Sequence, residues 1–224
     1  MIQSALLKRI PHLIHGFSTR AAGNMKKDLV ARKKFIDSIG IDEDISFPEQ
    51  IHGAVVSTAR EPKGSDGLVG RSPVGIFTAD CVPILCADPT TKTVAAVHAG
   101  WRGTLAGIAK NAVVAMKSTG SDTANIFVWI GPHIGACCYS VDPGRKSRFV
   151  EAFGDDVRVA SFAENSWHLD LGYVNYRLLL ESGIKPEHID VALSCTSCQH
   201  DEFFSYRKDT KETFGEMMGV IGWK

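Results

Sequence analysis

Two apolar, strand-like runs joined by a short polar turn restrict the fold of this chain more than any other feature. They are "VGIFTADCVPILCAD" (residues 74–88) and "TVAAVHAG" (residues 93–100), and the turn "DPTTK" between them contains an Asp-Pro pair. β-Branched and other apolar residues on both sides of turn residues predict a hairpin-like pair of strands. Because the second run is apolar at almost every position, we expect it to be buried within a sheet.

A helical pattern begins directly after the second run. Apolar residues recur at intervals of three and four after Thr104: Leu105, Ile108, Ala109, Ala112 and either Ala115 or Met116. This periodicity predicts an amphipathic helix with Thr104 as its N-cap. Similar patterns predict helices at 28–40, 142–154 and 169–183, and strands at 125–131 and 189–194.

These strands and helices mix without the strict alternation of a doubly wound sheet, which favours an α+β fold. The 224 residues contain no internal repeat, low-complexity tract or Pro/Gly/Ser-rich linker, so we expect a single domain over residues 1–224. The 25 basic and 25 acidic side chains cancel, which argues against nucleic acid, an anionic membrane or a polyanionic substrate. We therefore expect a small-molecule partner. The sequence does not predict the oligomeric state.

The N-terminal stretch and the cysteines indicate the cellular compartment. "MIQSALLKRIPHLIHGF" lacks a long apolar segment followed by a small-residue cleavage site, and no window of the sequence comes close to the roughly 18 apolar residues of a membrane span. We expect a cytoplasmic protein without a membrane segment. A chain of this length does not need disulfides, so we expect its six cysteines to be free thiols or metal ligands.

Three potential metal ligands stand where an expected strand meets a glycine or a charged residue: His52 in "EQIHGAVV", Cys81 in "TADCVPIL" and His98 in "AVHAGWRG". Two imidazoles and a thiolate suit zinc, and three protein ligands leave a fourth position for water, whose pKa zinc lowers to roughly 7. We predict one zinc per chain, held by these three residues and a water. Each residue alone also has a structural interpretation, as a turn histidine, a buried thiol or a hydrogen-bonded imidazole.

Seven segments connect the chain to a known family. They are "HGFSTR" (15–20), "QIHG" (50–53), "SDGLV" (65–69), "TADCVPIL" (78–85), "VHAGWRGT" (97–104), "IGPHIGACCY" (130–139) and "FFSYRKD" (203–209). In these segments the chain closely resembles the laccase-domain family, also called the multicopper polyphenol oxidase or purine nucleoside phosphorylase family. The resemblance implies strands in two packed layers flanked by helices. It also matches His52, Cys81 and His98 to the zinc ligands of the family.

The resemblance further implies that the substrates are purine nucleosides and phosphate. The reactions would be phosphorolysis of adenosine, inosine and methylthioadenosine to the base and a ribose 1-phosphate, and deamination of adenosine to inosine. Deamination needs a carboxylate that moves a proton beside an activated water. Asp80 is the first candidate for this catalytic role and Asp66 is the next, and we otherwise assign Asp66 to substrate binding. Either residue can instead be a turn or cap aspartate.

Phosphorolysis requires a site for the phosphate anion, which a guanidinium holds through paired hydrogen bonds. The candidates are Arg20 and Arg102, predicted to be catalytic, and Arg207, predicted to bind substrate. Arg20 ranks first because Ser18 and Thr19 beside it offer further donors. Each arginine can instead be a solvated surface residue.

Two more residues are predicted to bind substrate. Trp101 lies in the glycine-rich exit from the second run, where it can pack beneath the site, and Cys138 lies in the glycine-rich turn "GPHIGACCY". Cys195 and Cys198 form a lone C-x-x-C pair, for which a second zinc or a redox pair is conceivable and structural thiols are favoured.

The chain departs from the family pattern at the expected rim of the substrate site. His133, Ser140 and Glu216 stand where relatives commonly have cysteine, an acidic residue and arginine, and "STRAAGN" replaces a more glycine-rich turn. These departures bear on nucleoside preference rather than on the metal ligands.

Three alternatives remain open. Two histidines and one cysteine resemble a blue-copper centre, which adds a distant axial methionine, but none of the eight histidines forms the His-x-His pairs of a multicopper oxidase. Copper-dependent polyphenol oxidation is therefore less favoured than zinc chemistry. A cysteine hydrolase would use Cys81 as nucleophile and His98 as base. A binding module would hold a structural metal with four protein ligands.

Overall fold

The largest sheet carries the predicted hairpin at its centre. The computed structural model describes residues 1–42, 44–58 and 63–224, and this sheet has the strand order β11-β7-β5-β6-β3-β2. Its strands are β2 (Val56–Ser57), β3 (Gly67–Gly70), β5 (Val82–Asp88), β6 (Thr93–Ala99), β7 (Phe127–Ile130) and β11 (Ile189–Val191). β5 and β6 pair antiparallel along their whole length, and every residue of both strands is buried. The predicted hairpin and the buried second strand are therefore confirmed.

Two smaller sheets accompany the large one. The first has the order β1-β12-β4, formed by β1 (Leu13–Phe17), β12 (Met217–Trp223) and β4 (Val74–Thr78). The second has the order β8-β10-β9, formed by β8 (Ser140–Val141), β10 (Ser166–Leu169) and β9 (Ala160–Ala163). Leu85 and Ala96 of the large sheet share an apolar core with Ile76 and Ile221 of the first small sheet, so these two sheets pack face to face.

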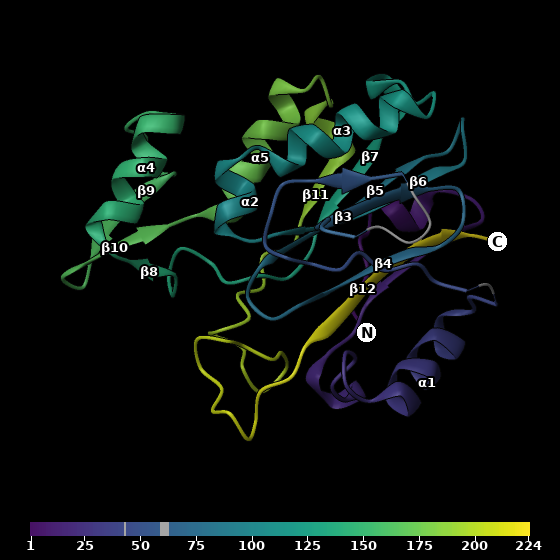
Figure 1. Ribbon diagram of the computed structural model, residues 1–224, viewed down its shortest axis with the longest axis horizontal. Coiled ribbons are helices and arrows are strands. Elements are labelled where there is room, and N and C mark those ends of the chain that lie inside the picture. The colour runs from purple at the N-terminus through teal and green to yellow at the C-terminus, as the bar shows by residue number, and fades with distance from the viewer. Residues whose placement is uncertain (43, 59–62) are drawn as a thin grey trace.

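Helices cover both outer faces of this pair of sheets (Figure 1). α3 (Ile108–Ser118) and α5 (Leu171–Glu181) pack on the large sheet beside α2 (Trp101–Leu105), whereas α1 (Leu29–Ile39) lies on the small sheet. α4 (Pro143–Phe153) contacts the β8-β10-β9 sheet, and the 3-10 helices are Leu7–Arg9, Arg20–Ala22, Thr123–Asn125 and Pro186–His188. The α+β class, with two packed strand layers flanked by helices, is confirmed. The single domain over residues 1–224 stays a prediction.

The three other predicted helices begin at aspartate caps. Asp28, Asp142 and Asp170 each accept a hydrogen bond from a backbone N–H of the first turn of α1, α4 and α5. These bonds satisfy donors that have no partner within the helix. α1 ends at Gly40, whose φ of 74° is left-handed and therefore suits glycine.

The prediction of one helix with Thr104 as its N-cap is wrong. The helical pattern is divided between α2 and α3, whose N-caps are Gly100 and Gly107. Thr104 lies inside α2, fully buried, and its hydroxyl accepts a hydrogen bond from the Asn175 amide at 2.9 Å. Gly107, with φ of 79°, separates the two helices and is the N-cap of α3. The left-handed glycine breaks the helix, while the apolar residues keep helical spacing across the break.

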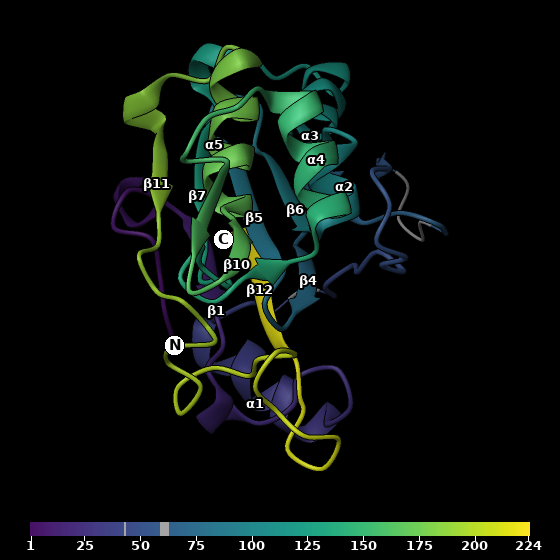
Figure 2. The same ribbon diagram turned by 90° about the vertical axis from the view of Figure 1, so that its left-hand side faces the viewer.

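The apolar run at residues 74–88 is also divided, into β4 and β5, which belong to different sheets. Asp80 lies in the connection and has φ of 79°, a conformation that turns the chain sharply from one sheet to the other. Residues 192–216, which contain no helix or strand, cross below the ends of these strands (Figure 2). Long irregular segments within a folded domain are commonly functional. Among the described residues, none of the helices has the length and apolarity that crossing a bilayer would require.

Candidate metal centre and its cavity

The structure brings His52, Cys81 and His98 together. One potential ligand atom of each lies within 4.8 Å of the others, and the two imidazole centroids are 4.8 Å apart. Cys81 immediately precedes β5 and His98 lies in β6, so the antiparallel register of these strands sets the two side chains near one another. His52 arrives from the turn before β2. The distances place all three residues within reach of one cation.

Asp66, the residue before β3, contacts this group from the side of the sheet. Its Oδ1 lies 2.9 Å from His98 Nδ1, and the carboxylate accepts hydrogen bonds from the backbone N–H groups of Ile51, His52 and Gly53 at 3.2, 2.8 and 2.6 Å. Asp66 is fully buried. An imidazole that donates Nδ1–H to a carboxylate presents Nε2 for a metal. The geometry therefore favours a positioning role for Asp66 over the substrate contact that the sequence predicted.

The backbone around the ligands is strained. Gln50, His52 and Asp80 have φ of 60°, 61° and 79°, left-handed values that are uncommon for residues other than glycine. Gly100 supplies space, because a Cβ at this position would lie 3.2 Å from Cys81 Sγ and 3.3 Å from His52 Cδ2. A side chain at this position would push Cys81 and His52 by a few tenths of an ångström, so glycine favours their close approach.

The thiolate form of Cys81 and the protonated form of His98 stabilise one another. Burial opposes ionisation of the Cys81 thiol, but the neighbouring imidazoles of His98 and His52 outweigh it and lower the pKa of Cys81 to about 7. Burial likewise opposes protonation of His98, but the charge of Cys81 and the hydrogen bond to Asp66 raise the pKa of His98 to about 9. A thiolate is the form of cysteine that binds metals and attacks electrophiles.

His52, Cys81 and His98 line a cavity of about 540 Å³, whose walls differ in chemistry. Aromatic side chains on its walls are Trp101, Tyr139, Tyr206 and Phe214, and polar or charged ones include Lys26, Gln50, Asp80, Arg145, Arg207 and Glu216. The volume lies within the usual range for small-molecule sites. Of the predicted site residues other than the three ligands, the cavity contains Asp80, Trp101 and Arg207.

Asp80 connects Cys81 to residues 192–216. Its Oδ1 accepts a hydrogen bond from the Thr196 hydroxyl, and its Oδ2 accepts from the Ser205 hydroxyl and the Arg207 backbone N–H, at 2.6, 3.0 and 2.8 Å. The Arg207 side chain donates to the Ser140 hydroxyl at 2.8 Å and lies over the Tyr139 ring. Ser140, which departs from the family pattern, therefore accepts a hydrogen bond that positions the Arg207 side chain at the cavity.

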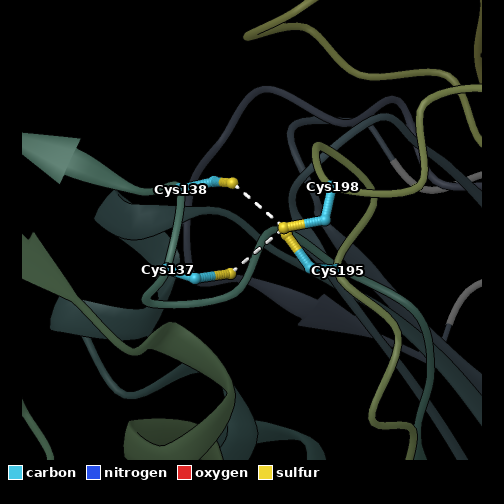
Figure 3. A group of neighbouring side chains, drawn as sticks. All are labelled: Cys137, Cys138, Cys195 and Cys198. Atoms are coloured by element: carbon cyan, nitrogen blue, oxygen red, sulfur yellow. Dashed lines mark hydrogen bonds between the residues drawn. The ribbon is translucent and has the colours of Figure 1, made fainter.

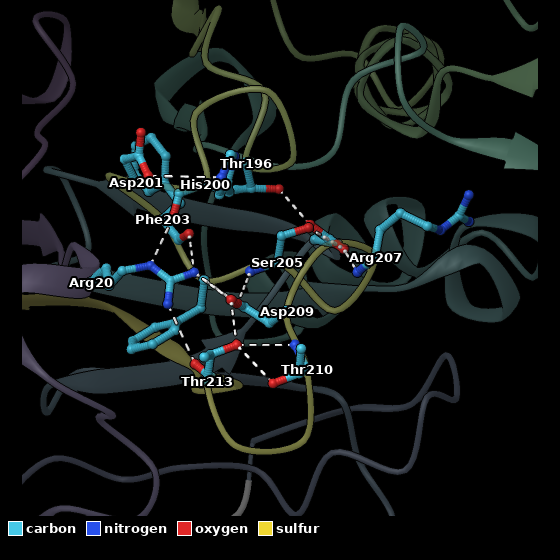
Figure 4. Close-up of polar contacts among 12 residues, drawn as sticks. Arg20, Thr196, His200, Asp201, Phe203, Ser205, Arg207, Asp209, Thr210 and Thr213 are labelled. Carbon is cyan, nitrogen blue, oxygen red and sulfur yellow. Dashed lines mark hydrogen bonds and ion pairs between the residues drawn. The ribbon is translucent and has the colours of Figure 1, made fainter.

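Arg20 lies apart from the cavity. Its guanidinium donates to the Asp209 carboxylate at 2.7 Å and to the carbonyl oxygens of His200, Phe203 and Thr213 (Figure 4). These bonds link the 3-10 helix Arg20–Ala22 to residues 192–216. Because Arg20 is not among the described residues that line the cavity and its guanidinium donors are engaged within the fold, the geometry does not favour the phosphate contact predicted for Arg20.

Arg102 and Cys138 also lie outside the described lining of the cavity. Arg102 is exposed and its guanidinium lies 5.1 Å from the centre of the Trp101 ring. Cys138 belongs to a second group of potential metal ligands, with Cys137, Cys195 and Cys198. Glu216 and His133 also depart from the family pattern. Glu216 lines the cavity and forms an ion pair with Lys26 at 3.2 Å, whereas His133 is buried.

Sequence reasoning missed Arg145 and the aromatic side of the cavity. Arg145 lies in α4, its guanidinium is 4.5 Å from the Trp101 ring centre, and its Nε is buried without a hydrogen-bond partner. A buried donor without a partner is unusual. In the sequence, Arg145 is one of several basic residues on a predicted surface helix, and nothing distinguishes it there.

The chain is similar to known proteins over most of its length. A family model described as multi-copper polyphenol oxidoreductase laccase matches residues 17–224. The chain is 35% identical over 198 residues to the purine nucleoside phosphorylase YlmD of Geobacillus stearothermophilus, covering 78% of this chain and 70% of that protein. It is 33% identical over 203 residues to the adenosine deaminase RL5 of an unknown prokaryotic organism, covering 80% of this chain and 76% of that protein. Among solved structures, the hypothetical protein YfiH of Bacillus licheniformis matches with a TM-score of 0.85 at 30% identity, over 95% of this chain and 93% of that chain.

Proposed function

This chain belongs to the laccase-domain family, whose model is described as multi-copper polyphenol oxidoreductase laccase, and we propose that it is a zinc-dependent purine nucleoside phosphorylase that also deaminates adenosine. The observation that carries the proposal is the convergence of His52, Cys81 and His98 on a cavity with aromatic and cationic walls. The names of two relatives, a purine nucleoside phosphorylase and an adenosine deaminase, supply the reaction classes.

The three residues fit zinc in their donor atoms and in their surroundings. Two imidazoles and one thiolate are ligands that zinc accepts, Asp66 orients one imidazole, and the cavity leaves an open side. A zinc ion held there would act as a Lewis acid toward an atom of the reactant. We assign the three ligands to that ion.

The cavity walls suit a purine nucleoside and a phosphate. Trp101, Tyr139 and Phe214 offer aromatic surface for a flat base. Arg145 and Arg207 on the same cavity offer guanidinium groups for the phosphate. In phosphorolysis these arginines would hold phosphate while its oxygen bonds to the ribose anomeric carbon and the bond to the base breaks.

Asp80 is the carboxylate that we propose for proton transfer. Its Oδ1 accepts one hydrogen bond, from Thr196, whereas Oδ2 accepts two, so Oδ1 retains a lone pair that can take up a proton. A proton held at Oδ1 could pass to the leaving base or to the amine that leaves C6 of adenosine. Arg102 and Arg20 would act at most on the surroundings of this site, through Trp101 and through residues 192–216.

A cysteine hydrolase is the alternative that a specific observation favours, because the pKa of Cys81 is lowered to about 7 next to His98. Zinc and alkylation separate the two functions. The phosphorylase is expected to lose activity on chelation, and zinc is expected to protect Cys81 from iodoacetamide. A hydrolase would remain active without metal and would lose activity when Cys81 is alkylated. Copper is less favoured, since no methionine is found among the described residues that line the cavity.

The deciding experiment is elemental analysis followed by chromatography of the products of adenosine, with and without phosphate. Adenine formed only with phosphate would support phosphorolysis, and inosine formed in both conditions would support deamination. Cys81→Ala is expected to abolish both activities, whereas Cys86→Ala, which removes a buried thiol within β5, is expected to retain them. A purified, zinc-loaded protein that forms neither product would contradict the proposal.

A further inference from the structure

Four cysteine sulfurs gather outside the proposed catalytic cavity. Cys137 and Cys138 lie in the loop after β7, and Cys195 and Cys198 lie in residues 192–216 (Figure 3). All four sulfur atoms lie within 4.8 Å of one another, and Cys198 Sγ is 3.5 Å from Cys137 Sγ and 3.3 Å from Cys138 Sγ. All four cysteines are free thiols. Two distant segments of the chain therefore contribute one pair of thiols each.

The spacing of the sulfurs suits one tetrahedral metal ion. Zinc–sulfur bonds of about 2.3 Å at tetrahedral angles place neighbouring sulfurs about 3.8 Å apart. The two shortest-range contacts, 3.5 and 3.3 Å, lie a few tenths of an ångström below this value, and all four sulfurs lie within 4.8 Å of one another, so small side-chain rotations would complete the tetrahedron. A cluster of several metal ions would need thiolates that lie further apart.

The backbone already holds the two segments in register. His133 N–H donates to the Ser194 carbonyl at 3.4 Å, and Thr196 N–H donates to the His133 carbonyl at 3.0 Å. Gly135 N–H donates to Cys195 Sγ at 3.2 Å, a contact that stabilises negative charge on sulfur. A Cβ on Gly135 would lie 3.3 Å from Cys137 Sγ, so glycine leaves room for the sulfurs.

We propose that these four cysteines bind a second zinc ion, separate from the ion assigned to His52, Cys81 and His98. Four thiolates leave no open position, which is the arrangement of a structural rather than a catalytic zinc. Thiolate ligands also select zinc over harder divalent ions. The ion would fasten residues 192–216 to the loop after β7. Those residues carry Ser205 and Arg207, the partners of Asp80 at the cavity.

Elemental analysis of variants tests the second site independently of nucleoside chemistry. The unaltered protein is expected to contain two zinc ions per chain. The double variant Cys195→Ser/Cys198→Ser and the double variant His52→Ala/His98→Ala should each contain one. X-ray absorption of the histidine variant should show its zinc surrounded by sulfur alone at about 2.3 Å. Cys86→Ala, which removes a thiol outside both groups, should retain two ions.

A measurement on a protein with all four cysteines covers the case in which the cysteine variant does not fold. In the histidine variant, the four thiols should resist a thiol reagent until a chelator is added, and a mercurial should release one zinc per chain. Equal zinc content in the cysteine variant and the unaltered protein would overturn the proposal. So would thiols in the histidine variant that react fully without chelator, or a cysteine-bound ion other than zinc. An unaltered protein that contains two zinc ions per chain but does not convert nucleosides would refute the proposed function and would leave the second zinc site supported.

Discussion

Substitution of Asp66 by asparagine tests whether the buried carboxylate controls metal binding. Each carboxylate oxygen faces two donors: Oδ1 faces His98 Nδ1 and the His52 N–H, and Oδ2 faces the Ile51 and Gly53 N–H groups. Asparagine has a single side-chain oxygen. Whichever way its amide turns, the NH₂ group therefore faces two donors and cannot accept from either of them.

The expected loss follows from the bonds that asparagine cannot make. Loss of a partner that orients a metal-bound histidine weakens metal binding by about 10- to 100-fold, or about 1.4 to 2.7 kcal/mol. Each buried donor left without an acceptor costs about 1–3 kcal/mol of folding free energy in addition. The zinc dissociation constant of Asp66→Asn should therefore be about 10- to 100-fold higher than that of the unaltered protein. We would measure it by competition with a coloured chelator, in the Cys195→Ser/Cys198→Ser background so that a single site binds.

Asp88→Asn is the matched control for Asp66→Asn. Asp88 is also fully buried and accepts hydrogen bonds from Thr90 N–H and the Thr91 hydroxyl. It lies at the end of β5 that is far from Cys81. This variant should unfold at a lower temperature and bind zinc as the unaltered protein does. Unchanged zinc affinity in Asp66→Asn, or an equal loss of affinity in Asp88→Asn, would refute the reasoning.

Three further predictions concern other residues. Gly100→Ala should weaken zinc binding by about tenfold, because its Cβ would crowd Cys81 Sγ and His52; zinc content after dialysis checks it, and full occupancy would contradict it. Arg145→Gln should raise the KM for phosphate by about 10- to 100-fold, since a charged hydrogen bond contributes about 1.5–3 kcal/mol; steady-state kinetics check it, and an unchanged KM would contradict the assignment. Burial lowers the pKa of His15 to about 4, so its neutral form stabilises the fold above pH 6.5, and up to about 3 kcal/mol should be lost as pH falls from 6.5 to 4. Urea unfolding of His15→Gln should show a smaller loss over that range.

The sequence predicted the helices and the central hairpin well because local signals determine them. Asp28, Asp142 and Asp170 cap helices at the predicted positions, and the runs of β5 and β6 are apolar on both faces. The prediction failed where tertiary contacts outweigh local pattern. The apolar spacing around Thr104 continues unchanged across Gly107, so it gave no indication that two helices share it. The β1-β12-β4 sheet joins strands from both ends of the chain, a pairing that periodicity does not reveal.

The candidate site divides in a similar way. The candidate ligands His52, Cys81 and His98 could be predicted from the family segments, because each of the three residues lies in one of those segments. Contacts between distant segments could not be predicted. Arg20 pairs with Asp209, whereas the sequence predicts a catalytic role for it. Asp66 is buried behind His98, whereas the sequence predicts substrate binding. Arg145 was missed because only the folded chain brings α4 next to Trp101.

β12 is the middle strand of its sheet, although it follows every other strand in the sequence. β1 and β4 pair with its two sides. During translation β1 and β4 therefore leave the ribosome before β12 does. The edges of β1 and β4 that pair with β12 stay unpaired until β12 has been synthesised. A nascent chain stalled before residue 217 would expose those two edges to chaperones or to neighbouring nascent chains.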